Sequence, residues 1–347
     1  DPEERAHFLT SHYPEDAELR YLVLELYASR SGRPDLDDVS DELAQCFVGA
    51  VDQLDEAEAD HLVGRRIGPY RLLHLIGAGG MGLVYKAVRD DGQFRRTVAL
   101  KLLRFGAAAS PEALRRFRYE RQLLARLEHP HIARLYGGGV SEDGLPYLAM
   151  EYVAGENLLD YCDRKRLPVA ARLALFETVC HAVHFAHARL VLHRALKPGN
   201  ILVFEDEKGC PHVKLLDFGI GKLLAGEEDA NEFTAPVTRA GAQPLTPEYA
   251  APEQIRAAAV STATDVYALG VVLYQLLTGR RPYELPGRLQ HEVERIICEE
   301  HPARPSAVVT RTTTRPGRDG GTQTLRPSDL GRRRGVTAER LRRKLAG

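Results

Sequence analysis

The sequence contains no tryptophan, only two methionines and no long hydrophobic run. Its five cysteines are scattered and form no C-x-x-C pair, which argues against a zinc site or a dithiol redox motif and favours a reduced setting. The most apolar stretch, residues 266–277, is too short and too interrupted to cross a bilayer. The first residues show neither the basic start nor the apolar run of a signal peptide. We therefore expect a cytoplasmic chain without a membrane segment.

A strong charge of one sign is also lacking. The 47 basic and 48 acidic residues leave a net charge of -1 at pH 7, so the whole chain has no general attraction to nucleic acid. The two ends differ, because residues 1–66 are acidic and residues 301–347 are rich in arginine. No aromatic side chains for base stacking are interleaved with these arginines. A solvated basic segment is therefore favoured over a nucleic-acid contact.

The order of the expected elements indicates the fold class. Residues 1–64 place apolar side chains at helical spacing with acids opposite, so they read as an acidic helical extension. It is either a solvated appendage or a segment that docks a partner. Strands followed by helices predict an α+β protein with a sheet-rich lobe before a helical lobe. The strands are expected at Tyr70–Ile76, Leu83–Arg89, Thr97–Leu103 and Tyr147–Tyr152, and the main helices at Pro111–Leu127, Val169–Leu190 and Thr264–Thr278.

The C-terminal part has a different composition. Residues 301–334 are dominated by proline, threonine, glycine and arginine, which predicts a poorly ordered insertion or tail. Val336–Ala346 is expected to form one short basic helix.

A glycine-rich run, Gly77–Gly82, fits the pattern G-x-G-x-x-G. Dinucleotide-binding folds share this pattern, but there the run opens a helix. Here it is followed by the β-prone sequence from Leu83 to Val88, which predicts a strand-turn-strand hairpin. Its glycines would let the backbone lie against phosphate groups without Cβ clashes. An ordinary glycine hairpin without a ligand remains the alternative for this run alone.

A lysine follows in the third expected strand, within Val98-Ala99-Leu100-Lys101. This run resembles the V-A-I-K of the third strand of protein kinases, and the resemblance implies that the Lys101 ammonium group holds phosphates and needs a carboxylate to keep it oriented. Glu120 on the following helix is favoured over Glu112 and Glu128, because leucines pack beside it at helical spacing.

Three further motifs complete the pattern. The octapeptide His193–Asn200 reads H-R-A-L-K-P-G-N, residues 217–219 read D-F-G, and residues 251–253 read A-P-E. With the glycine run and V-A-L-K, they occur in the order and spacing of protein kinases. Over about residues 68–300 the chain resembles a bacterial, eukaryotic-like Ser/Thr protein kinase.

The resemblance implies a two-lobed fold, with an antiparallel β-sheet and one helix in the N-lobe (65–150), a hinge (151–155) and a mainly helical C-lobe (156–300). The kinase domain would extend over 65–347. The resemblance also implies ATP and Mg²⁺ as cofactors and a protein Ser/Thr hydroxyl as phosphate acceptor. Self-association for autophosphorylation is left open.

The resemblance assigns a role to individual residues. Nucleotide binding falls to Ile76, Gly77, Ala78, Gly79, Gly80, Met81, Gly82, Leu83, Val84, Ala99, Lys101, Met150, Glu151, Val153 and Leu202. Catalysis falls to Lys101, Glu120, Lys197, Asn200 and Asp217 and to the position of Ala195, with Asn200 and Asp217 as magnesium ligands. Regulation falls to Arg194, Thr234, Thr238 and Thr246, since a phosphate on Thr234 or Thr238 would pair with Arg194. Asp265 is expected to pin the backbone of the octapeptide.

Two features depart from the family pattern. Ala195 stands where the family has the Asp that accepts the substrate proton, so this form is expected to be inactive yet to bind nucleotide. Either the chain is a natural pseudokinase or the Asp was replaced by engineering, and the intact neighbours favour engineering. Second, residues 301–347 do not obviously supply the family's last helices, so the C-lobe is expected to be short or truncated.

Overall fold

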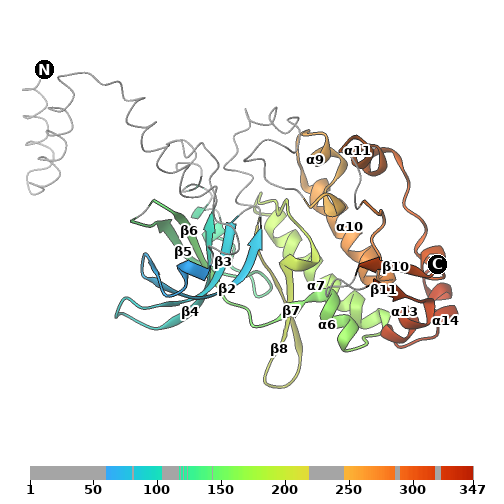
Figure 1. Ribbon diagram of the computed structural model, residues 1–347, viewed down its shortest axis with the longest axis horizontal. Helices are drawn as coiled ribbons and strands as arrows, with labels where there is room; N and C mark the ends of the chain where they lie inside the picture. Colours follow the sequence, from blue (N-terminus) through green and yellow to red (C-terminus); the bar gives the residue numbers. More distant parts are fainter. Residues whose placement is uncertain are drawn as a thin grey trace, which may run out of the picture.

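The computed structural model describes residues 60–79, 82–103, 117, 119, 121–122, 124–142, 144–218, 246–285, 290–316 and 322–346. Figure 1 shows two lobes, a sheet built from the earlier part of the chain and a mainly helical part built from the later part. The predicted α+β class is confirmed. The expected extension over residues 1–64 lies almost wholly outside the described residues.

The N-lobe, called the upper lobe from here on and drawn at the left of Figure 1, is one antiparallel sheet of six strands in the order β1-β2-β3-β4-β6-β5. Its inner face buries Leu72, Tyr85 and Leu100, each fully shielded from solvent. Alternation along the strands sends every second side chain to this core and the others toward the lower lobe or the solvent. The strands are β1 (Arg66–Ile67), β2 (Tyr70–Gly79), β3 (Gly82–Arg89), β4 (Arg96–Leu103), β5 (Leu135–Val140) and β6 (Pro146–Glu151).

The glycine-rich run lies at the turn of the β2–β3 hairpin, where Gly79 pairs with Gly82. Gly82 has φ = 131°, and a Cβ atom there would lie 1.8 Å from the carbonyl oxygen of Leu102. Only glycine fits this position, because L-residues rarely adopt this backbone conformation and the neighbouring strand leaves no room. The strand-turn-strand prediction is confirmed.

The C-lobe, called the lower lobe from here on, packs two long helices against a small sheet of three strands. Helix α7 (Val169–His187) and helix α10 (Thr262–Thr278) contribute nearly half of its buried apolar residues. Ser261 caps the start of α10, and Gly279, in the left-handed conformation, ends it. The other elements are β7 (Glu156–Asn157), α6 (Leu158–Arg164), η3 (Pro198–Asn200), β8 (Ile201–Glu205), β9 (Pro211–Leu215), η5 (Pro247–Tyr249), α9 (Pro252–Ile255) and α11 (Gln290–Glu299), while η2 (Asp60–Leu62) precedes the upper sheet.

Within the described residues, α7 is the one helix long and apolar enough to cross a membrane. Its residues Val179, Ala182 and Val183 are nevertheless buried in the lower-lobe core. This is how the core helix of a globular lobe behaves, since its apolar face is covered by protein.

The expectation of poor order over residues 301–334 is wrong for the residues described there. The segment forms α12 (Pro305–Val308), the hairpin β10 (Thr313–Pro316) and β11 (Thr322–Leu325), and α13 (Pro327–Arg333). The expected C-terminal helix is confirmed as α14 (Ala338–Lys344). These elements lie against the lower end of α10 in Figure 1. They enclose their own apolar cluster of Val309, Leu325, Leu330 and Leu341.

A buried charge cluster holds α13 to the lobe. Arg172 of α7 and Arg334 after α13 are at most 1% exposed. The carboxylate of Asp163 accepts from Arg172 at 2.8 Å and from Arg333 at 2.9 Å, and Arg334 lies 3.8 Å away. Burial and the neighbouring charge of Arg172 lower the pKa of Arg334 to about 10. One carboxylate therefore balances three guanidinium groups.

Candidate nucleotide-binding cleft

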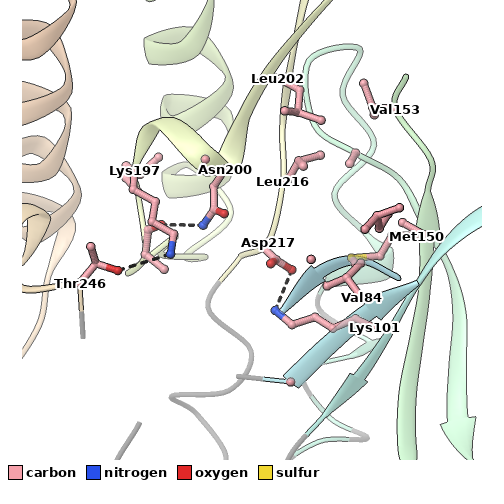
Figure 2. Close-up of a pocket in the computed structure, with 18 of the residues that line it drawn as sticks. Val84, Lys101, Met150, Val153, Lys197, Asn200, Leu202, Leu216, Asp217 and Thr246 are labelled. Atoms are coloured by element: carbon pink, nitrogen blue, oxygen red, sulfur yellow. Dashed lines mark hydrogen bonds and ion pairs between the residues drawn. The ribbon is translucent and has the colours of Figure 1, made fainter. Parts of the chain in front are cut away.

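A cavity of about 560 Å³ lies between the two lobes. Figure 2 shows its walls: strands of the upper sheet on one side, and the octapeptide with the start of β8 on the other. Most predicted site residues line it, although they come from sequence positions more than 160 residues apart. The predicted residues in its lining are Ile76, Gly77, Ala78, Gly82, Val84, Ala99, Lys101, Met150, Glu151, Val153, Arg194, Ala195, Lys197, Asn200, Leu202, Asp217 and Thr246.

The apolar part of the cleft forms a slot. Val84 and Ala99 come from paired strands above, and Leu202 comes from β8 below. Leu216 completes the floor, a residue that the sequence reasoning missed because its role depends on the β9 register. An apolar slot beside residues 151–153, which line the same cavity, suits a purine ring.

Leu83 was predicted in this lining but lies elsewhere. It is 1% exposed and packs in the core of the upper sheet. Because successive strand residues face opposite sides, Val84 faces the cleft and Leu83 cannot. Gly79, another predicted residue, pairs with Gly82 at the hairpin.

The polar part of the cleft centres on Lys101. Its ammonium group is almost fully buried and lies 2.9 Å from the Asp217 carboxylate. Asp217 has φ = 54°, a left-handed conformation that few residues other than glycine, asparagine and aspartate adopt. The backbone thus turns the carboxylate into the cleft. The predicted Lys101–Glu120 pair concerns a residue outside the described ones and stays a prediction.

The octapeptide is fixed by buried contacts. The amides of His193 and Arg194 each donate to the Asp265 carboxylate at 2.8 Å, so the predicted pinning by Asp265 is confirmed. The His193 ring lies 4.6 Å from the Phe218 ring, and its Nε2 is 2.9 Å from the carbonyl of Leu216. Complete burial lowers the pKa of His193, which keeps the ring neutral, so Nε2 carries the hydrogen of this bond.

Side chains after Ala195 continue this network. The Lys197 ammonium donates to the Thr246 hydroxyl at 3.4 Å, and the Asn200 amide donates to the Ala195 carbonyl at 2.8 Å. Gln254 was missed by the sequence reasoning. Its Nε2 donates to the Arg194 carbonyl at 3.0 Å, and its Oε1 accepts from the Ala251 amide at 3.2 Å. Gln254 therefore joins the A-P-E segment to the octapeptide.

The residues suit a divalent cation bound together with phosphates. Because the Asn200 amide nitrogen is committed to Ala195, its oxygen is left for the cleft. Asp217 supplies a carboxylate to the same cavity. Among the described residues no group of three His, Cys, Asp or Glu side chains could hold a metal alone. Magnesium is commonly bound by one or two protein ligands plus substrate phosphates, so the donor set fits.

The remaining predicted residues lie outside the described ones. They are Gly80, Met81, Glu120, Thr234 and Thr238. The pairing of Arg194 with a phosphate on Thr234 or Thr238 therefore stays a prediction.

Comparison with known proteins gives consistent matches. The family model for the protein kinase domain matches residues 70–315. The serine/threonine-protein kinase PrkC of Bacillus subtilis is 39% identical over 225 residues, which are 64% of this chain and 32% of that protein. PknA of Mycobacterium tuberculosis is 41% identical over 227 residues, which are 64% of this chain and 49% of that protein. This chain thus spans a third to a half of the curated relatives it matches.

Among solved structures, the kinase domain of Mycobacterium tuberculosis PknI, as a double mutant, matches with a TM-score of 0.50 at 25% identity. The match covers 82% of this chain and 97% of that one.

Proposed function

Because this chain belongs to the protein kinase family, we propose that its cleft binds ATP with Mg²⁺ for transfer of the γ-phosphate to protein Ser or Thr hydroxyls. The observation that carries the proposal is the convergence of Lys101, Asp217, Asn200 and Lys197 on one cavity. In this form the transfer is silenced at Ala195. Relatives named as serine/threonine kinases support the acceptor class.

Each residue has a definite task in this proposal. The apolar slot of Val84, Ala99 and Leu202 holds the adenine ring. Lys101 and Asp217, which pair in the structure, would hold the phosphate oxygens and the cation respectively. When bound, Mg²⁺ neutralises charge on the phosphates as the transfer proceeds. Lys197 binds the phosphate that is transferred, and the amide oxygen of Asn200 completes the cation site.

The missing step is proton transfer from the acceptor hydroxyl. The Ala195 methyl group can neither accept a proton nor orient a hydroxyl. General base catalysis and positioning are typically worth about 10²–10⁴-fold in rate. We therefore assign low turnover to this form while its nucleotide binding is retained. The engineered origin of Ala195 belongs to this proposal, as does a cytoplasmic location supported by the scattered cysteines.

A second candidate function follows from the same residue. If Ala195 is natural, the chain is a pseudokinase that signals through nucleotide-dependent binding. The single altered position among otherwise intact cleft residues favours the first candidate. Binding to other proteins is common to both candidates, whereas a protein substrate and self-association for autophosphorylation are proposed under the first only.

The test compares the chain with its Ala195→Asp variant in ATP, Mg²⁺ and a protein acceptor. We expect phosphoserine or phosphothreonine by mass spectrometry only with Ala195→Asp, and equal ATP affinity for both. Ala195→Asn is the matched control, since it fills the space without a base. If Ala195→Asp binds ATP yet transfers no phosphate, the scaffold function replaces the kinase function.

A further inference from the structure

The surroundings of Ala195 are held without help from its own side chain. Asp265 fixes the amides of the two preceding residues, and Gln254 fixes the carbonyl of Arg194. Asn200 fixes the carbonyl of Ala195 itself. The Ala195 methyl group thus sits on a rigid backbone in the wall of an open cleft. A missing side chain on such a backbone leaves its space in place rather than collapsing it.

The Lys197 side chain lines the same cavity as Ala195. Lys197, two residues on, has the Thr246 hydroxyl as hydrogen-bond partner at 3.4 Å. Within the described residues, no Asp or Glu forms an ion pair with Lys197. The Asp217 carboxylate, which lines the same cavity, is paired with Lys101 at 2.9 Å. Among the residues that the structure describes, this partly buried ammonium and its hydroxyl partner have no counter-anion, which favours the binding of a small anion.

We propose that the space beside Ala195 binds a small monocarboxylate, formate being the smallest fit, which then serves as the proton acceptor in phosphoryl transfer. The inference rests on the proposed kinase function. Formate is the carboxyl group that Asp would carry beyond its Cβ atom, so it can lie against the Ala195 methyl group. Acetate and propionate must place extra carbon atoms there and should bind less well.

The proposed step balances without any other reagent. A bond forms between the acceptor oxygen and the γ-phosphorus, and the bond from that phosphorus to the β-phosphate oxygen breaks, releasing ADP. The hydroxyl proton passes to formate, which leaves as formic acid and loses the proton to water. The Lys197 ammonium group has three N–H donors, so it pairs with a formate oxygen as well as with the transferred phosphate.

Binding is tested first, without nucleotide. The probe is ¹³C-formate, whose NMR line broadens on exchange with the protein. A ligand of three non-hydrogen atoms binds no tighter than about 1 mM, so fast exchange is expected. Broadening should occur with the chain as it is. It should vanish in Lys197→Met, which removes the cation, and in Ala195→Asp, which fills the space. Equal broadening in all three proteins would mean an adventitious ion only and would overturn the site.

Turnover is tested next, with ATP, Mg²⁺ and a protein acceptor. Saturating formate should raise phosphate transfer by the Ala195 chain about 10-fold or more, a part of the factor that a fixed base supplies. Sodium chloride at equal ionic strength should not. Nitrate has the planar shape of formate but is a far weaker base, so it should compete with formate without restoring transfer.

The outcomes separate the two proposals. If the Ala195→Asp variant is active but formate raises phosphate transfer by the Ala195 chain no more than chloride does, formate is not the proton acceptor and the kinase function still stands. A silent Ala195→Asp variant would overturn the kinase function, and the NMR comparison would still decide whether the anion site exists. A gain with formate that nitrate reproduces would show a salt effect and contradict the proton-acceptor role.

Discussion

Replacing Asp163 by Asn removes the one negative charge from among Arg172, Arg333 and Arg334. The Asp163 carboxylate accepts from two of these guanidinium groups at 2.8 and 2.9 Å, and its side chain is 26% exposed. Hydrogen bonds to charged groups are worth about 1.5–3 kcal/mol each. Removing one partner of a buried ion pair costs about 3–5 kcal/mol. With the partial exposure, we expect a loss of about 3 kcal/mol in the free energy of unfolding.

Thermal unfolding measures this loss. One kcal/mol corresponds to roughly 2–4 °C in domains of this size class, so the melting temperature should fall by roughly 6–12 °C. Hydrogen exchange should show the largest loss of protection in α13, since Arg333 and Arg334 anchor it. Glu339→Gln is the matched control, because Glu339 pairs with arginines on an exposed helix face and such pairs contribute little. If the melting temperature falls no more than in the control, the Asp163–arginine charge cluster does not stabilise the fold as argued.

The pH dependence has a definite sign. Burial would raise the pKa of Asp163, but the charges of Arg334 and Arg172 outweigh it and lower the pKa below its ordinary value. A carboxyl group with a lowered pKa in the folded state stabilises the fold above its unfolded pKa of about 3.9. This stabilisation is lost as the pH falls below that value toward the folded pKa. Asp163→Asn should therefore show a flatter stability profile below about pH 4.

Three other changes test the cleft and its supports. Asp265→Ala leaves the amides of His193 and Arg194 without an acceptor, and should lower unfolding free energy by about 3 kcal/mol in urea titration, whereas an unchanged midpoint would contradict the pinning. Gly82→Ala places a Cβ atom 1.8 Å from a carbonyl oxygen, so circular dichroism should show loss of cooperative unfolding, and a wild-type melt would contradict the hairpin geometry. Asp217→Asn should abolish the Mg²⁺ dependence of ATP binding in calorimetry, with Asp206→Asn in the distant β8–β9 turn as control.

Elements set by residues close in sequence could be predicted, whereas contacts between residues far apart in sequence could not. The glycine hairpin followed from Gly77–Gly82 and the β-prone residues after it. The order of residues 301–334 was mispredicted, because composition alone does not show that Val309 and Leu341 pack in one cluster after the chain has folded back. The role of Gln254 could not be predicted either, since its partner Arg194 is 60 residues away. The alternation rule, applied to β3, would have placed Leu83 in the core.

The most direct test of the account is the rate of phosphate transfer at saturating ATP and Mg²⁺, measured side by side for this chain and Ala195→Asp. The account predicts equal nucleotide affinity and a rate about 10²–10⁴-fold higher with Ala195→Asp. Equal rates, or a loss of nucleotide binding in either protein, would contradict the claim that the cleft lacks only the carboxylate at position 195.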